Sequence, residues 1–423
     1  MKYINFVNLR YNPKNTDLIC SFYLEKDEKS SLNFQQLAGG VAAESSIGTW
    51  TELTTEKPYM KKLAAKVFSI KGNMIKIAYP IELFELDNVP NIMSSIAGNI
   101  FGLKDIKNLR LEDINFPTKM IEKFKGPVYG IQGVRKLLKV YNRPLVGTIV
   151  KPKLGLNTKD HAQVAYNAWI GGCDIVKDDE NLSSQSFNDF YARIKETLRL
   201  RDKAEKETGE KKVYMANVTA ETNEMLKRMD FIKKCGGEYA MVDILTVGWA
   251  GLQTISNHNS DLKLVLHAHR AGHATFTRNP KHGISMLTIA KLCRLIGMDQ
   301  LHIGTVVGKM EGPKNEVVFL EEEIEKNLIR EKGHALAEKW YDIKPMFAVC
   351  SGGLHPGHVP ALIKILGKEI IIQMGGGIHG HPQGTVAGAK AARQAVDATM
   401  KNISLKEYSK THKELKEALE KFT

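Results

Sequence analysis

The chain has 423 residues, enough for roughly two or three domains with a large buried core. Hydrophobic residues make up 43% and charged residues 25%, which is typical of a soluble globular protein, and no apolar run approaches the roughly 20 residues that cross a bilayer. The net charge of +13 would suit an anionic substrate. Basic and acidic residues are interleaved and no basic tract is studded with aromatics, so we expect neither nucleic-acid nor membrane binding.

The termini and cysteines indicate a cytoplasmic protein. No charged region, apolar core and cleavage site follow one another at the N-terminus, so no export signal is visible. The five cysteines, at positions 20, 173, 235, 293 and 350, are too far apart for a CxxC motif. We expect them to be reduced and mostly buried.

The first 130 residues alternate strand-like and helical segments. Strands are predicted over 17–24 and 67–77, and helices over 32–45 and 91–100. This pattern predicts an N-terminal α+β domain covering residues 1–130.

From Pro144 onward, short apolar strands alternate with helical stretches, which indicates a parallel sheet. The eight predicted strands are 145–150, 174–176, 213–218, 239–245, 262–267, 300–303, 345–349 and 369–373. Eight such repeats fit a closed (β/α)8 barrel over residues 131–423. Nearly every unusual polar cluster follows one of these strands, where barrel active sites are built.

The second of these strands ends in Lys177, Asp178, Asp179 and Glu180. Alternation places Lys177 and Asp179 on one side of the chain, with Glu180 within reach at the following bend. Two carboxylates beside an amine suggest Mg²⁺. A lysine whose pKa is lowered by burial can add CO2 as a carbamate, which is a further oxygen ligand. Taken alone, the same residues could form a solvated acidic turn.

Cations and imidazoles follow other predicted strands. Lys151 and Lys153 flank a proline after the first strand, a pattern that also occurs in surface turns. The stretch 267–273 contains three histidines that could converge on a metal, but Arg270 among them disfavours zinc and suits a phosphate.

Glycine-rich loops follow the last three strands. His302 precedes the loop 304–309, which ends in Lys309 and lacks the GK[ST] ending of a phosphate cradle, so a mobile lid is the better interpretation. The runs 351–353 and 375–377 could be tight turns or could bind phosphate through backbone N–H groups. Together these loops imply two separated anion sites, as a bisphosphate with Mg²⁺ between its ends would need.

These residues resemble the large subunit of ribulose-1,5-bisphosphate carboxylase/oxygenase (RuBisCO). The resemblance covers nearly the whole chain and includes segments 41–51, 171–181, 304–312 and 351–353. It implies a ferredoxin-like α+β N-terminal domain followed by a C-terminal TIM barrel. It also implies Mg²⁺-dependent carboxylation, and oxygenation by O2, of ribulose 1,5-bisphosphate to give 3-phosphoglycerate.

The resemblance assigns roles to individual residues. Lys177 would be the carbamylated lysine, and Asp179 and Glu180 would complete the Mg²⁺ ligands. The remaining catalytic residues would be Lys151 and His269 in proton transfer, Lys153 in enolisation, Lys309 in holding CO2, and Glu44 from the N-terminal domain.

Substrate contacts are implied in the same way. One phosphate end would be bound by Arg270, His273, His302, Ser351, Gly352 and Gly353, and the other by Gly375, Gly376 and Thr49. Glu44, Thr49, Trp50 and Asn99 would complete the barrel of a partner subunit. The expected unit is therefore a homodimer or a higher homo-oligomer, and no small subunit is expected.

Departures from the plant-type pattern narrow the subgroup. Ile149 replaces a threonine, with Thr148 one place earlier, which puts one substrate hydroxyl contact in doubt. The long C-terminal tail is absent. Both features favour archaeal-like form III or form II/III, which implies a place in AMP-derived ribose salvage.

The main alternative is a RuBisCO-like enolase or isomerase that fixes no CO2. Such relatives typically lack part of the catalytic set. This chain keeps Lys309, Glu44, Lys151 and His269, which favours the carboxylase.

A helical insert is predicted at about 313–344. One apolar stripe runs through Val317, Leu320, Ile324 and Leu328, and a second through Ala335, Leu336 and Trp340 follows a break at Gly333. We expect a helix, a bend and a second short helix. The stripes could simply cover the barrel flank, or Phe319 or Trp340 could contact a neighbouring dimer.

Overall fold

The structure is a computed structural model that describes residues 2–308 and 314–422. Its contacts divide the chain into two compact units. The first consists of Met1–Gly126, Gly272–Ile296 and Lys326–Ile343, and the second of Pro127–Ala271, Gly297–Glu325 and Lys344–Thr423. The domain limit near residue 130 stays a prediction.

The first unit contains a five-stranded sheet in the order β10-β4-β1-β3-β2. Its strands are β1 (Leu18–Lys26), β2 (Lys66–Lys71), β3 (Met74–Tyr79), β4 (Ile106–Asn115) and β10 (Gly283–Ile284). With α1 (Phe34–Glu44) after β1 and α2 (Val89–Ile96) after β3, they form the β-α-β-β-α-β arrangement of a ferredoxin-like domain, as predicted. The single strand predicted over 67–77 is wrong, because Gly72 has a positive φ of 57° and the chain turns there between β2 and β3.

Short elements complete this unit. They are the 3-10 helices η1 (Tyr3–Phe6), η2 (Pro58–Leu63), η3 (Ile81–Leu83) and η4 (Asn99–Gly102), the helices α3 (Thr118–Ile121), α9 (Ala274–Thr277) and α10 (Met286–Ile296), and the strands β12 (Leu328–Ile329) and β13 (Glu338–Lys339). A buried ion pair joins α10 to β4, with Lys291 Nζ 2.9 Å from Asp113 Oδ1. Burial raises the pKa of Asp113 although Lys291 opposes the shift.

The second helix predicted in the insert is wrong. Within the predicted second helix, Glu338–Lys339 instead form β13, which pairs antiparallel with β12 (Leu328–Ile329) in the first unit. Gly333, with a φ of 65°, sits in a tight turn where Lys332 and Ala335 exchange backbone hydrogen bonds. Trp340 is fully buried against the Arg294 guanidinium, 4.6 Å from its ring, so the contact proposed between Trp340 and a neighbouring dimer is also wrong.

The first predicted helix of the insert is present in the second unit as α11 (Lys314–Glu325). Val317, Leu320 and Ile324 are buried, as the apolar stripe predicts. Leu328 does not continue that stripe, because it lies beyond the helix and is exposed.

The second unit is a closed parallel barrel in the order β11-β14-β15-β5-β6-β7-β8-β9. Its strands are β5 (Leu145–Ile149), β6 (Ile175–Lys177), β7 (Val213–Asn217), β8 (Tyr239–Asp243), β9 (Val265–His269), β11 (Gln300–Gly304), β14 (Phe347–Cys350) and β15 (Ile370–Gln373). All eight predicted strands are confirmed within a few residues.

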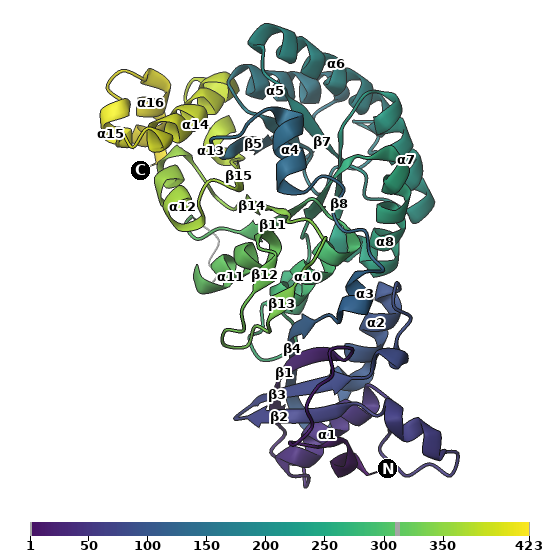
Figure 1. Ribbon diagram of the computed structural model, residues 1–423. Coiled ribbons are helices and arrows are strands. Elements are labelled where there is room, and N and C mark those ends of the chain that lie inside the picture. The colour runs from purple at the N-terminus through teal and green to yellow at the C-terminus, as the bar shows by residue number, and fades with distance from the viewer. Residues whose placement is uncertain (1, 309–313, 423) are drawn as a thin grey trace. The chain divides into compact units, whose positions relative to one another are not determined.

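Helices surround these strands, as Figure 1 shows for α5 to α8. The helices of this unit, besides α11, are α4 (Gly130–Leu138), α5 (Thr158–Ile170), α6 (Phe190–Thr208), α7 (Thr222–Lys234), α8 (Ile244–Leu262), η5 (Pro356–His358), α12 (Val359–Leu366), α13 (Gly376–His379), α14 (Gly384–Met400), α15 (Leu405–Tyr408) and α16 (Lys413–Phe422).

The barrel core explains why these segments form strands. Its buried side chains include Leu145, Ile175, Val213 and Phe347, and α4 packs against them through residues such as Val134. Because both faces of a barrel strand are covered, the strands are short apolar runs without polar alternation. The strand β6 starts after a glycine pair: a Cβ on Gly171 would lie only 2.4 Å from the Val386 carbonyl oxygen in α14.

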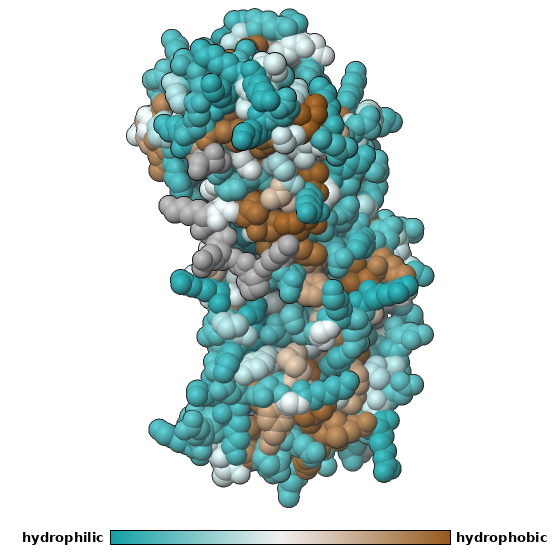
Figure 2. All heavy atoms as spheres, turned by 90° about the vertical axis from the view of Figure 1, so that its left-hand side faces the viewer, coloured by the Kyte–Doolittle hydropathy of each residue, from teal (hydrophilic) through white to brown (hydrophobic). Residues whose placement is uncertain are grey.

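Hydrophilic side chains predominate on the face drawn in Figure 2, where apolar areas form separate patches. Within the described residues, no helix is long and apolar enough to span a membrane.

Candidate active site

The turn after β6 carries the most unusual buried charges. Lys177 is the last residue of that strand and is 1% exposed. Its Nζ donates to the Asp178 carbonyl oxygen at 2.7 Å and lies 3.3 Å from Met241 Sδ. Burial lowers the pKa of Lys177, and the negative charges of Glu180 and Asp179 only partly offset this. The amine is therefore more easily deprotonated than an ordinary lysine.

Asp178 anchors this turn from behind. Its Oδ1 accepts from the Tyr214 hydroxyl and lies 3.1 Å from His161 Nε2, and its Oδ2 accepts from the Asn217 N–H at 3.0 Å. Arg193 Nε lies 3.3 Å from the same Oδ2. Burial alone would raise the pKa of Asp178, but Arg193 and these hydrogen bonds lower it well below its ordinary value. Asp178 thus stays ionised and fixes the backbone that carries its neighbours.

The next two carboxylates face the lysines that follow β5. Lys151 Nζ lies 2.5 Å from Asp179 Oδ2, and Lys153 Nζ lies 3.3 Å from Glu180 Oε1. Burial would raise the pKa of Glu180, but a backbone hydrogen bond and the neighbouring cations lower it to about 2. Glu180 and Asp179 raise the pKa of Lys153. Glu180 is therefore available as an anionic oxygen donor at neutral pH.

His269 is oriented by a carboxylate at the end of β8. Its Nδ1 is 2.9 Å from Asp243 Oδ1, while its Nε2 is 3.8 Å from Glu180 Oε2. An ionised Asp243 requires a proton on Nδ1, which leaves Nε2 as the acceptor. The Ala271 N–H also approaches Nδ1, but at 3.3 Å this contact is longer and weaker than the one with Asp243. This arrangement suits a base whose reactive nitrogen points toward the carboxylate cluster.

His302 and Ser351 come together beside His269. His302 Nδ1 is 2.8 Å from Ser351 Oγ, and its ring centroid is 4.7 Å from that of His269. Its buried Nε2 has no hydrogen-bond partner among the described residues. Burial lowers the pKa of His302 well below its ordinary value. Burial also lowers the pKa of Arg270 to about 10, so Arg270 remains a cation at neutral pH.

Some glycines of the two runs lie where a side chain would be crowded or would strain the backbone. A Cβ on Gly375 would lie 3.2 Å from Lys151 Cε, so this glycine lets the loop pack against the lysine. Gly352 and Gly353 have φ values of 120° and 71°, which favour glycine. Gly376 begins α13, and nothing lies within 4 Å of the place of its Cβ.

The remaining predicted residues belong to the first unit or are not described. Glu44 ends α1 and accepts from the Tyr3 hydroxyl at 2.8 Å. Trp50 is 82% exposed, Thr49 is half-buried and Asn99 is exposed. His273 is also in this unit, with Nδ1 2.9 Å from Thr277 Oγ1. Lys309 lies outside the described residues.

Two carboxylates beside the buried amine of Lys177 are the groups that fit a metal ion at this site. Across residues 2–308 and 314–422, no group of three His, Cys, Asp or Glu side chains could hold a metal ion. The predicted set contains two, Asp179 and Glu180, and a third anionic oxygen would complete it. A carbamate on the buried amine of Lys177 would supply it, and hard oxygen ligands of this kind suit Mg²⁺.

Comparison with known proteins identifies the family. The model of the ribulose bisphosphate carboxylase large chain, catalytic domain, matches residues 130–422, and that of its N-terminal domain matches residues 5–120. The chain belongs to the RuBisCO large-chain family. It is 53% identical to the ribulose bisphosphate carboxylase of Methanosarcina mazei and 49% identical to that of Methanocaldococcus jannaschii, with 99% of each chain covered in both cases.

Solved RuBisCO structures agree with this assignment. The dimeric archaeal RuBisCO of Hyperthermus butylicus is 46% identical, with a TM-score of 0.94, and the match covers 100% of this chain and 99% of that one. The octameric RuBisCO of Pyrococcus horikoshii is 44% identical, with a TM-score of 0.94, covering 99% and 96%. These archaeal relatives agree with the predicted form III subgroup.

Sequence reasoning missed two polar residues of this RuBisCO site. Asp243 orients His269, and the Asn217 side-chain amide donates to the Glu180 carbonyl oxygen at 3.0 Å. Both end barrel strands, β8 and β7. The rule that located Lys177, a polar residue where a barrel strand ends, would have found them.

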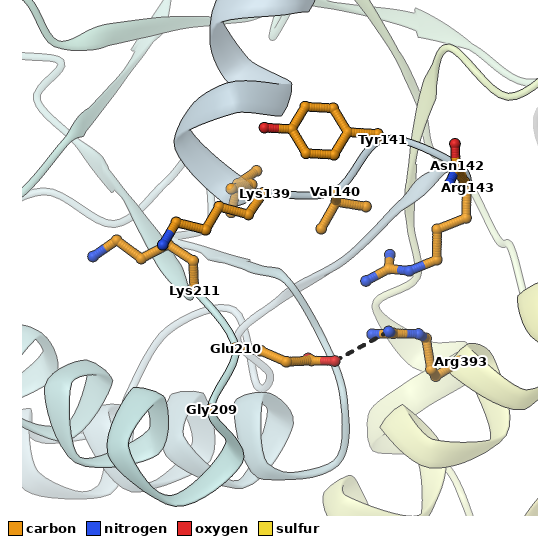
Figure 3. A pocket seen from close by; sticks show the side chains of 10 residues that line it. Lys139, Val140, Tyr141, Asn142, Arg143, Gly209, Glu210, Lys211 and Arg393 are labelled. Atoms are coloured by element: carbon orange, nitrogen blue, oxygen red, sulfur yellow. Dashed lines mark hydrogen bonds and ion pairs between the residues drawn. The ribbon is translucent and has the colours of Figure 1, made fainter.

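A hollow of ≈ 490 Å³ lies at the opposite, N-terminal ends of β5 and β7 (Figure 3). Four cationic side chains line it, and three of them form close ion pairs with carboxylates. Arg143 donates to Asp174 at 2.6 and 2.8 Å, and Arg393 donates to Glu210 at 3.1 Å. Lys211 lies 2.9 Å from Glu205 Oε1. This hollow of the RuBisCO barrel is therefore an ion-paired structural region and not a strong anion site.

Proposed function

We propose that this chain is a Mg²⁺-dependent ribulose-1,5-bisphosphate carboxylase. It would add CO2 and water to the bisphosphate and release two molecules of 3-phosphoglycerate. The observation that carries the proposal is a buried lysine of lowered pKa beside two carboxylates that face Lys151 and Lys153. Its occurrence in a chain similar over its full length to ribulose bisphosphate carboxylases supports the same conclusion.

Activation would begin at Lys177. Its neutral Nζ would attack the carbon of CO2, forming an N–C bond and losing one proton to solvent, which leaves an anionic carbamate. The carbamate, Asp179 and Glu180 would hold Mg²⁺, which when bound would stabilise negative charge on substrate oxygens. Asp178 would keep this turn in place, since Arg193 holds it ionised.

Proton transfers would depend on three residues around the carboxylates. Asp243 holds the His269 Nδ1 proton, so Nε2 would accept a proton from the water that hydrates the carboxylated intermediate. Lys151 would return a proton to the carbanion left when the carbon–carbon bond breaks. Lys153 would favour enolisation by placing a positive charge beside Glu180.

The two phosphates would bind at opposite sides of the barrel mouth. Arg270, His302 and Ser351 are proposed for one of them, and the backbone at Gly375 and Gly376 for the other. Lys309 would hold CO2 after enolisation. A place in AMP-derived ribose salvage stays a prediction.

Labelled bicarbonate tests the function directly. The purified protein is preincubated with Mg²⁺ and CO2, and ribulose bisphosphate is then added. Label in 3-phosphoglycerate is expected, and O2 should compete and be consumed. Consumption of the bisphosphate without label would instead support the enolase or isomerase alternative.

We propose a homodimer as the active unit, since relatives are dimeric or octameric. Glu44, Thr49, Trp50 and Asn99 would complete the partner's site, and the exposure of Trp50 supports this. Mixing inactive Glu44→Gln and Lys177→Arg subunits under exchanging conditions should restore about a quarter of wild-type activity, because half of the random dimers would hold one intact site. No recovery, with exchange verified by mass, would mean that each chain builds its own site.

A further inference from the structure

A hydrogen-bonded chain of partly to fully buried side chains lies behind Lys151 and the Gly375–Gly376 loop. Thr148 is the fourth residue of β5 and is fully buried. Its hydroxyl donates to the Met374 carbonyl oxygen at 2.8 Å, and its oxygen lies 2.9 Å from His379 Nε2. On the far side of the ring, His379 Nδ1 is 3.0 Å from Thr385 Oγ1. The chain thus joins β5, the end of β15, α13 and α14.

The proton positions in this chain follow from the donors. The Thr148 hydroxyl has one proton, which the Met374 carbonyl takes, so His379 Nε2 must donate to the Thr148 oxygen. Burial lowers the pKa of His379 to about 4, and the nearby charge of Lys151 acts in the same direction. The ring is therefore neutral near pH 7, and Nδ1 accepts the Thr385 hydroxyl proton. The His379 ring also has a hydrogen bond to the Ile149 backbone, which raises its pKa and only partly offsets the effect of burial.

Thr148 does not replace the threonine that Ile149 displaces. Its hydroxyl is buried and its only proton is bound to Met374, so it is not available to a substrate in the barrel mouth. The Ile149 side chain instead lies beside the loop, with Cδ1 3.9 Å from the place of a Gly375 Cβ. The Thr148 hydroxyl is therefore placed to hold the loop from behind.

We propose that His379 is a positioning residue: through Thr148 it fixes the backbone of Gly375 and Gly376, and with it the wall against which Lys151 packs. The inference rests on the proposed function, in which this loop binds one phosphate of the substrate. Gly375 follows Met374 directly, and His379 ends the helix that Gly376 begins. The loop is therefore held at both of its ends by one hydrogen-bonded group.

The variants separate positioning from mere folding. His379→Leu removes both ring nitrogens, whereas His379→Gln keeps an N–H that can reach Thr148. Thr148→Val removes the hydroxyl at almost constant volume, so it tests the same link if His379→Leu folds poorly. His381→Leu is the matched control: His381 is a buried histidine two residues on, but its Nε2 is 2.9 Å from the Glu414 carbonyl oxygen in α16, away from the loop.

Two measurements are made on each full-length variant. Steady-state carboxylation gives KM for ribulose bisphosphate and kcat, and calorimetric titration with ribulose bisphosphate in the absence of Mg²⁺ gives a Kd without turnover. We expect His379→Leu and Thr148→Val each to raise KM and Kd about tenfold (~1.4 kcal/mol) while kcat changes less than about threefold. Their double variant should show no further rise, because they act through one link. His379→Gln should recover most of the loss, and His381→Leu should change neither constant.

The two proposals fail in different ways. A wild-type protein that binds the bisphosphate but incorporates no label overturns the carboxylase, and the Kd series then still tests His379. Unchanged KM and Kd in both His379→Leu and Thr148→Val overturn the positioning role. An equal rise in His381→Leu does so too, since the effect would then belong to general destabilisation of the segment.

Discussion

The two ends of the barrel hold similar charges but in different states. At the N-terminal ends of the strands, Asp174 accepts two hydrogen bonds from Arg143 and a third from the Val146 N–H. At the C-terminal ends, the buried Lys177 amine has a carbonyl oxygen and a thioether sulfur as its hydrogen-bond partners among residues 2–308 and 314–422, with carboxylates of neighbouring residues nearby.

The pKa directions express this difference. Burial opposes both charges of the Arg143–Asp174 pair, yet each partner stabilises the other, so the pKa of Arg143 rises and that of Asp174 falls. Burial instead dominates at Lys177 and weakens its charge. Charge content alone therefore does not distinguish a structural end from a reactive one; the pairing of each charge does. Four predictions test this comparison.

The largest effect is expected from Lys177→Arg. A guanidinium stays protonated and cannot form a carbamate, so carboxylation should fall by at least about 10³-fold, as expected when several kcal/mol of metal catalysis is lost. Lys212→Arg is the control at the other end, where a fully buried lysine pairs with Glu210 at 2.8 Å. It should affect stability only. Comparable kcat losses in the two variants, measured with labelled CO2, would contradict the comparison.

The next effect concerns Asp243→Asn. The amide can no longer hold the His269 Nδ1 proton as a carboxylate does, so kcat should fall by about 10²-fold, a typical acid–base contribution. Asp230→Asn is the control, because Asp230 contacts the partly exposed His258 Nε2 at 2.7 Å on the surface. Its kcat should equal that of the wild type. A loss in Asp243→Asn that merely follows a lowered Tm would make Asp243 structural.

A stability effect is expected at Asp178. Its pKa in the folded chain is depressed below its ordinary 3.8, so the stability it contributes is present above that pH and is lost as the pH falls through and below it. Arg193→Met should cost about 3–5 kcal/mol at pH 7, because it leaves a buried carboxylate unpaired. The difference from wild type should shrink in acid.

Arg199→Met on the same helix is its control. Arg199 is 2.7 Å from Glu196 but largely exposed, so the cost should be below about 1 kcal/mol. Urea unfolding at several pH values measures both. A cost for Arg193→Met that does not change with pH would exclude Asp178 as its cause.

The smallest effect is expected from Glu210→Gln beside the hollow in Figure 3. Glu210 is partly exposed, and glutamine keeps an oxygen that can accept from Arg393 and from the buried Lys212, so the loss of the charge should cost about 1 kcal/mol. Carboxylation should be unaffected. A fall in kcat would show that this end of the barrel communicates with the site.

The sequence predicts elements best where burial is complete. Barrel strands such as 213–218 could be recognised because both faces are covered, and Lys177 and Asp179 because charge rarely follows such a strand. The segment through Ala335 and Trp340 is predicted as a helix but is a ribbon, because a few buried positions fit both the 3.6-residue period of a helix and the two-residue period of a strand. His379 and Thr148 were missed as partners because their contact depends on strand register across the barrel, joining residues 231 apart.

The ion pair between α10 and β4 joins residues that the ribosome makes far apart in time. Asp113 has no exposed surface in the folded chain, and its cation, Lys291, follows 178 residues later. The edge of β4 that pairs with β10 likewise has no strand partner until β10 has been synthesised. At about 5–20 residues per second, a ribosome would leave both without partners for roughly 9–36 s. The N-terminal sheet is thus the first part made and among the last to be completed, which makes the half-made chain a natural client for chaperones.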